Sequence, residues 1–169
     1  MVRNLILFFV FCPLLFAINS CKVYSFSGAN IPPDIHSFSV EVFQNRANNG
    51  PSSLSQDFTD KLKLKIQTEA GLRQATSDGD IQFKGAITSY AITSDAAVAN
   101  ATSALLRLTI TVQVDFLNTK DEMDNWSQSF SRYAQIPSSE SVTSVENQLI
   151  DEINKQLVDD IFQRALVKW

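Results

Sequence analysis

Cys21 and His36 are the side chains whose types most readily do chemistry, the first as a nucleophile or attachment point and the second as a proton carrier. His36 is the only histidine of the chain and stands close to Asp34. A hydrolase needs a nucleophile, a base and an orienting group that converge, and the sequence signals no activated nucleophile near this pair. We therefore interpret His36 as a solvated linker residue and expect no enzymatic activity, with an anchored hydrolase as the remote alternative.

Metal and phosphate sites have recognisable spacings that this sequence lacks. The stretch "NTKDEMD" carries carboxylates at Asp121, Glu122 and Asp124, but it has neither the glycine nor the final glutamate of a calcium loop. The sequence also contains no cluster of cysteine and histidine and no glycine loop that would cradle a phosphate. We expect neither a metal ion nor a cofactor.

Cys21 lies in a context that indicates modification rather than catalysis. Arg3 and then the apolar run Leu5–Ala17 form the charged and hydrophobic parts of an export signal, and the run is too short for the about 20 residues of a membrane-spanning helix. The following "AINSC" resembles a relaxed lipobox, with the small residue Ser20 before the cysteine. The similarity implies cleavage before Cys21 and diacylglycerol on its sulfur. The alternative is a plain secreted protein with a leftover thiol.

The composition indicates a globular domain and excludes general nucleic-acid binding. The chain is 44% hydrophobic and 19% charged, with a formal net charge of −4. Binding to a phosphate backbone depends on clustered cations, which an acidic chain does not supply. We divide the sequence into a signal peptide (1–20), a lipidated tether (21–36) and a single domain (37–169).

The elements that would position any site follow from the spacing of apolar residues. Four segments alternate in the manner of strands and two repeat in the manner of helices. The predicted strands are 37–43, 80–93, 106–116 and 126–136, and the predicted helices are 53–71 and 141–169. The predicted fold is therefore α+β in the order β-α-β-β-β-α, with two helices packed on one face of a mixed or antiparallel sheet of about four strands.

Several local features refine these elements. In the first strand, Phe38, Val40 and Val42 are expected to share one face. A change of phase within the second strand indicates a bulge near Gly85 or Ser89. The apolar stripe of the first helix and that of the second are predicted to face the sheet: Leu54, Phe58, Leu62 and Ile66; and Val142, Val145, Leu149, Ile153, Leu157, Ile161 and Leu166.

The sequence also predicts how the helices end and which ion pairs form along them. Gly71 is expected to end the first helix, because glycine readily adopts the left-handed conformation found there. Thr143 with Glu146 fits a capping box at the start of the second helix. Asp151 with Lys155, and Asp160 with Arg164, have the spacing of ion pairs along that helix.

The strand 106–116 alternates without a break, which predicts one buried and one exposed face. We expect the exposed side chains, together with Arg132 of the next strand and with Tyr133 as a further candidate, to form a polar surface that contacts a partner or lipid phosphates through charge-assisted hydrogen bonds. An ordinary solvated face is the alternative. The candidate residues of this surface are Arg107, Thr109, Thr111, Gln113 and Arg132.

Two further segments are candidates for contact with a partner. The loop Thr93–Ala104 is long for a hairpin, and its small residues could insert into a partner surface or simply form a loose tip. Trp169 closes the chain, where packing on the sheet is favoured over a role at an interface.

The order of these segments resembles a known family. Behind the lipobox come "YSFSGANIPPDIHSFSVEVFQN", "LRLTITVQVDFLN", "SFSRYA" and the closing "TSVENQLIDEINKQLVDDIFQRALVKW". Together they resemble the lipopolysaccharide-assembly lipoproteins of the LptE family, specifically its divergent branch, over Cys21–Trp169. The specificity comes from the order of the segments and from the topology.

The resemblance implies a non-enzymatic lipoprotein of the cell outer membrane, anchored to the inner leaflet on the periplasmic side. In that family the protein plugs the LptD β-barrel translocon, helps it to assemble, and helps lipopolysaccharide to reach the outer leaflet. The expected partners are thus an LptD-like barrel and lipopolysaccharide. The alternative is a lipid-anchored module that binds an amphiphile without a barrel.

Overall fold

Alternating apolar residues build the sheet against which the helices pack. The computed structural model describes residues 31–94, 106–136 and 140–167. Six strands form one mixed sheet: β1 (Ser37–Val40), β2 (Gln44–Asn45), β3 (Arg73–Gln74), β4 (Ile81–Ser94), β5 (Leu106–Asn118) and β6 (Trp126–Ile136). The spatial order is β3-β1-β4-β5-β6, with β2 also paired to β4. β4, β5 and β6 pair antiparallel, whereas β1 and β2 run parallel to β4.

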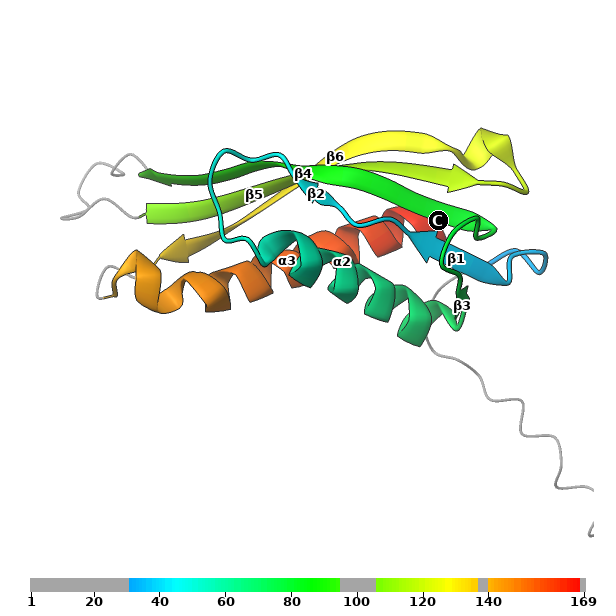
Figure 1. Cartoon of the computed structure of the whole chain (residues 1–169), viewed down its shortest axis with the longest axis horizontal. Coiled ribbons are helices and arrows are strands. Elements are labelled where there is room, and N and C mark those ends of the chain that lie inside the picture. The colour runs from blue at the N-terminus through cyan, green and yellow to red at the C-terminus, as the bar shows by residue number, and fades with distance from the viewer. Residues whose placement is uncertain (1–30, 95–105, 137–139, 168–169) are drawn as a thin grey trace, which may run out of the picture.

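Two helices cover one face of this sheet (Figure 1). They are α2 (Leu54–Lys65), which continues as a π-helical turn over Ile66–Ala70, and α3 (Val142–Leu166). A short 3₁₀ turn, Glu122–Asp124, lies between β5 and β6. The aromatic side chains between the two layers are fully buried: Phe38, Phe43, Phe58, Phe83 and Phe162.

The predicted α+β class and the packing of both helices on one face are confirmed. The sheet has six strands rather than about four, because two strands of two residues each, β2 and β3, join its parallel side. The predicted stripe of α2 is confirmed in full, since all four of its side chains have no exposed area. In α3 the stripe is also buried, except that Val142 is only partly covered.

The first strand differs from the prediction. It is interrupted after Val40, so that Val42 is 52% exposed and Phe43 is buried instead. The Phe43 ring packs edge-to-face on Phe58 with 5.0 Å between ring centroids, and its backbone N–H donates to the Thr59 hydroxyl at 3.1 Å. Because Phe43 makes these contacts with α2, the inward-facing position moves from residue 42 to residue 43.

Gly85 leaves room for the buried Phe43 ring because it has no side chain. A Cβ at this position would lie 2.0 Å from the Gln113 carbonyl oxygen and 2.6 Å from the Phe43 ring. The predicted bulge is confirmed at the second of its two sites, because the β4–β5 register shifts between Ile87 and Ser89. The extra residue lets Tyr90 return to the helix side of the sheet.

The helix ends are partly as predicted. Gly71 follows the π-helical turn in the left-handed conformation, with φ of 65°. The predicted capping box in α3 is wrong: Ser141 caps the helix and accepts the backbone N–H of Ser144. Glu146 instead accepts a hydrogen bond from the Tyr90 hydroxyl, which joins α3 to β4. Burial, and then this hydrogen bond, raise the pKa of Tyr90.

Ion pairs connect α2 to α3. Lys61 contacts Asp151 at 2.6 Å and Lys65 contacts Asp159 at 2.6 Å. The pair predicted within α3 between Asp151 and Lys155 is confirmed at 2.7 Å.

Candidate functional site

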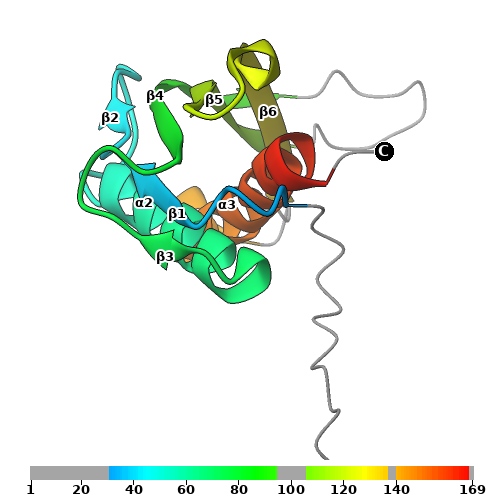
Figure 2. The ribbon, with the colours of Figure 1, turned by 90° about the vertical axis from the view of Figure 1, so that its right-hand side faces the viewer.

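The face of β4, β5 and β6 that points away from the helices carries the candidate partner-binding residues. Thr109, Thr111 and Gln113 point to this side, because the apolar residues between them face the core. Figure 2 shows both helices on the other side of these strands. We call this surface the outer face.

Directly paired residues of antiparallel strands share a face, so the register identifies the neighbours on the outer face. Thr109 pairs with Tyr133, Thr111 with Ser131 and Gln113 with Ser129. On β5 and β6, the middle of the outer face therefore carries uncharged polar side chains and one tyrosine, and β4 adds Ala86, Ser89 and Ala91 beside them.

Hydrogen bonds and a ring contact order the side chains of the outer face. The hydroxyls of Thr111 and Ser131 are 2.9 Å apart, and the Gln113 amide donates to Ser127 at 2.9 Å. Near the other end, the Arg107 guanidinium lies over the Tyr133 ring, 4.5 Å from its centroid. Such cross-strand contacts hold side chains in place before any partner binds.

Arg132 does not lie on the outer face, which corrects its predicted position. It pairs with Ile110, an inward residue, and therefore points toward the helices. Its guanidinium donates to both carboxylate oxygens of Asp160 on α3, each at 2.6 Å. The predicted pair of Asp160 with Arg164 is replaced by this contact, and Arg164 lies over the Trp126 ring at 5.3 Å.

A signal for this position was present in the sequence. Arg132 has the same parity in its strand as Phe130, Ala134 and Ile136, all of which are buried. The neighbouring residue Tyr133 points to the outer face, where it pairs with Thr109, and it is 51% exposed.

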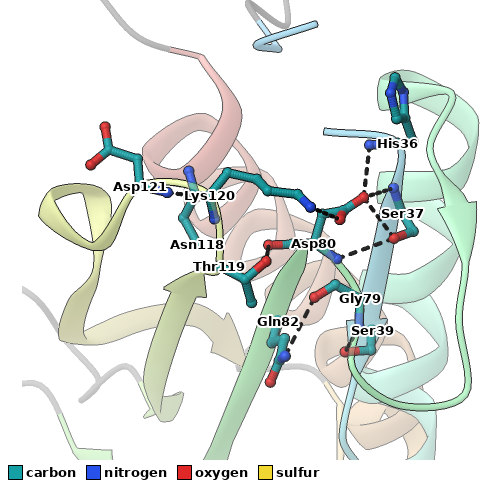
Figure 3. Close-up of polar contacts among 10 residues, drawn as sticks. All are labelled: His36, Ser37, Ser39, Gly79, Asp80, Gln82, Asn118, Thr119, Lys120 and Asp121. Carbon is teal, nitrogen blue, oxygen red and sulfur yellow. Dashed lines mark hydrogen bonds and ion pairs between the residues drawn. The ribbon is translucent and has the colours of Figure 1, made fainter. Parts of the chain in front are cut away.

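A second polar cluster, which the sequence analysis did not find, lies at one end of the sheet (Figure 3). Asp80 accepts the backbone N–H groups of His36 and Ser37, both at 3.0 Å, and the Ser37 hydroxyl at 2.8 Å. Its other carboxylate oxygen is 3.0 Å from the Lys120 ammonium group. We call these residues, with Thr119, the Asp80 cluster.

The Asp80 cluster connects three parts of the chain that are distant in sequence. The Thr119 N–H and hydroxyl both donate to the Asp80 carbonyl at 2.9 Å, so the turn after β5 is joined to the start of β4 and the start of β1. The backbone N–H of His36, then Lys120 and Ser37, hold the pKa of the Asp80 carboxyl well below its usual range. The cluster thus fixes the point at which the preceding segment enters the domain.

His36 contributes only its backbone to this cluster. Its imidazole is exposed and points away from the Asp80 carboxylate (Figure 3). Within the described parts of the chain there is no group of three or more histidine, cysteine, aspartate or glutamate side chains placed to hold a metal ion. The same residues contain no helix that is long and apolar enough to cross a membrane.

Several predicted features lie outside the described residues. They are the signal segment, Cys21, most of the Thr93–Ala104 loop and Trp169. The lipidation of Cys21 and the roles of the loop and of Trp169 therefore remain predictions.

Comparisons with known proteins give one family match and several structures of similar fold. A family model described as LptE, lipopolysaccharide-assembly, matches residues 35–165. No curated protein matches the sequence. The solved structure of the hypothetical protein CT253 from Chlamydia trachomatis is similar with a TM-score of 0.54 and 6% identity, covering 79% of this chain and 99% of that one. Protein XCC0632 from Xanthomonas campestris gives a TM-score of 0.53 and 12% identity, covering 79% and 84%. At such low identity these structures show the fold alone.

Proposed function

The chain belongs to the LptE family of lipopolysaccharide-assembly proteins, and from that premise we propose that it acts inside a β-barrel translocon of the LptD type. It is anchored to the periplasmic side of the outer membrane by acyl chains on Cys21. Two or three chains at about 0.8 kcal/mol per buried methylene give stable attachment without a membrane-spanning segment. The domain fills the barrel lumen, supports assembly of the barrel and helps lipopolysaccharide to reach the outer leaflet.

The observation that carries this proposal is the outer face. It is long, since β4 and β5 have 14 and 13 residues, and neither helix covers it. Its middle carries hydroxyl and amide groups that already bond to one another, which suits a polar, water-lined wall. Arg107, Thr109, Thr111 and Gln113 are the proposed contact residues, with Tyr133 in the place expected for Arg132.

The packing of the interior argues against the rival function, a carrier that encloses an amphiphile. The space between sheet and helices is occupied by large side chains such as Phe58, Phe83 and Phe162, which have no exposed area. An acyl chain could enter only by separating the two layers, which would cost the burial of these rings. We therefore expect any lipid to be held at the surface rather than inside.

Affinity purification of the full-length, tagged protein from detergent-extracted outer membranes tests the proposal. Recovery of a large β-barrel in a fixed stoichiometric ratio is the expected result. A protein that elutes alone with bound lipid would support the carrier and contradict the proposed function. Mass spectrometry of the same sample reports whether Cys21 carries acyl chains.

A further inference from the structure

The two edges of the sheet differ in a way that points to another polypeptide. At the parallel edge, the outermost strand, β3, has two residues, and β1 ends after four. At the other edge, β6 has 11 residues, and among the described residues no strand pairs with its outer side. An edge strand of this length presents a row of free N–H and C=O groups to a further strand.

Over the stretch Ser127–Ser131, β6 carries none of the usual protection against such pairing, and the inward charge Arg132 lies beyond this stretch. Exposed edges are commonly blocked by lysine, proline, a bulge or an inward charge. The stretch Ser127–Ser131 contains no ionisable residue and no proline, and its register with β5 is continuous. Arg132, the charge that follows, is already bound to Asp160.

A groove lies beside this stretch, between β6 and the last turns of α3. It has a volume of about 780 Å³ and includes Phe130 and Val167 as apolar contacts and the amides of Gln128 and Gln163. The charged side chains Asp124 and Arg164 also line it, but Asp124 accepts a hydrogen bond from Asn118 and Arg164 lies over the Trp126 ring. The Asp160 that binds Arg132 lies in the same lining, so this ion pair marks one end of the groove. In Figure 2, β6 and the end of α3 border the same side of the molecule. Strand-binding sites combine these two parts, a backbone edge for affinity and an adjacent groove for alternate side chains.

A second copy of this chain does not fit there. Paired strands lie about 4.8 Å apart, whereas packed helices need about 8–10 Å between their axes. Because α3 packs mainly against β6, two copies joined through β6 would bring their α3 helices closer than this.

We propose that β6 and this groove bind an extended, uncharged segment of a different polypeptide, which adds to the sheet as an antiparallel strand. Its backbone bonds to the edge of Trp126–Phe130, and every second side chain enters the groove against Phe130, Val167 and the two amides. This goes beyond the proposed function, because it concerns the edge and not the outer face, and it does not require the partner to be a barrel.

Hydrogen exchange of the Trp126–Phe130 amides, read by mass spectrometry, tests the proposal on the lipidated full chain. We expect exchange in outer-membrane preparations to be slower by roughly tenfold or more than in the protein purified in detergent. Equal exchange in both samples would overturn the proposal. Protection in vesicles of extracted outer-membrane phospholipid alone, or protection that grows with protein concentration after purification, would also overturn it, since lipid or a second copy would then be the occupant.

A matched pair of variants separates edge binding from a change in folding. Gln128→Lys places a charge in the groove, whereas Gln148→Lys makes the same change on an exposed position of α3. The membrane-dependent protection should disappear in the first and persist in the second, with both melting like the wild type. If protection persists in Gln128→Lys, the groove is not the site. If a barrel co-purifies while the β6 amides stay unprotected, this inference fails and the proposed function stands. If the β6 amides are protected but no barrel co-purifies, the proposed function fails and this inference stands.

Discussion

At the scale of single residues, Asp80 has the largest structural role that the sequence did not reveal. Its carboxylate is 19% exposed and accepts two backbone N–H groups, a hydroxyl and an ammonium group. No motif connects residues 36, 80 and 120 in the sequence, because they meet only after β1, β4 and the β5–β6 turn are assembled. Such a site depends on tertiary structure and cannot be predicted from local spacing.

Asp80→Asn is expected to lower the free energy of unfolding by about 2 kcal/mol at neutral pH, since hydrogen bonds to a charged group contribute about 1.5–3 kcal/mol. The folded-state pKa of Asp80 is lowered, so its contribution is present above the unfolded pKa of about 3.9 and is lost as the pH falls below that value. Thermal melts of both proteins should therefore differ at pH 7, and the difference should begin to shrink only below about pH 4. Asp78→Asn, a neighbouring exposed position with no such contacts, is the control and should match the wild type. A constant gap between Asp80→Asn and wild type at all pH values would contradict this role.

At the scale of elements, periodicity predicted most of what the structure shows. The stripe of α2 and the alternation of β5 are as expected, because each has one face against the core along its whole length. The prediction failed where one contact overrode the pattern, as at Phe43, which packs on Phe58. The predicted outward position of Arg132 is wrong, because its place in the alternation of β6 puts it on the side of Phe130 and Ala134, which face the helices.

Two of the leucines of α2, Leu62 and Leu64, provide a direct comparison of buried and exposed positions. Leu62 has no exposed area, whereas Leu64 is 61% exposed. Leu62→Ala should lower the free energy of unfolding by about 3 kcal/mol, and Leu64→Ala by less than about 1 kcal/mol. Chemical denaturation of the two variants measures the difference. Similar losses for both would mean that α2 packs in another orientation.

Asn154 is the polar exception in the buried stripe of α3. It has no exposed area, and neither polar atom of its amide has a hydrogen-bond partner in the described chain. Leaving such a group unpaired costs about 1–3 kcal/mol, so Asn154→Leu should raise the free energy of unfolding by a similar amount. Asn147→Leu, an exposed position of the same helix, should change it by less than about 0.5 kcal/mol. A less stable Asn154→Leu protein would show that the amide is satisfied in solution, for example by a buried water.

At the scale of the whole molecule, the Asp80 cluster and the outer face lie in different parts of the domain. The Asp80 cluster holds the segment that leads into β1, and the outer face lies along the length of the sheet. The fold class and the family were predictable from the order of segments. The unequal edges of the sheet were not, because the two-residue strands β2 and β3 carry no periodic signal.

Cys21→Ala should leave the domain folded and release it from membranes. The reason is that the acyl chains, not the protein surface, supply the attachment. Membrane fractionation followed by immunoblotting measures the release, and an unchanged melting temperature shows that the domain is intact. A variant that stays in the outer-membrane pellet after a high-salt wash would contradict lipid anchoring by this residue.

The central claim is that the outer face of β4, β5 and β6 binds the translocon barrel. The most direct measurement is the amount of barrel recovered with tagged Thr111→Lys, in the middle of that face, relative to Thr68→Lys, an exposed position on the helix side. A lysine ammonium buried without a partner is costly, so we predict a loss of roughly tenfold or more for Thr111→Lys and wild-type recovery for Thr68→Lys. Equal recovery with both variants would contradict the claim.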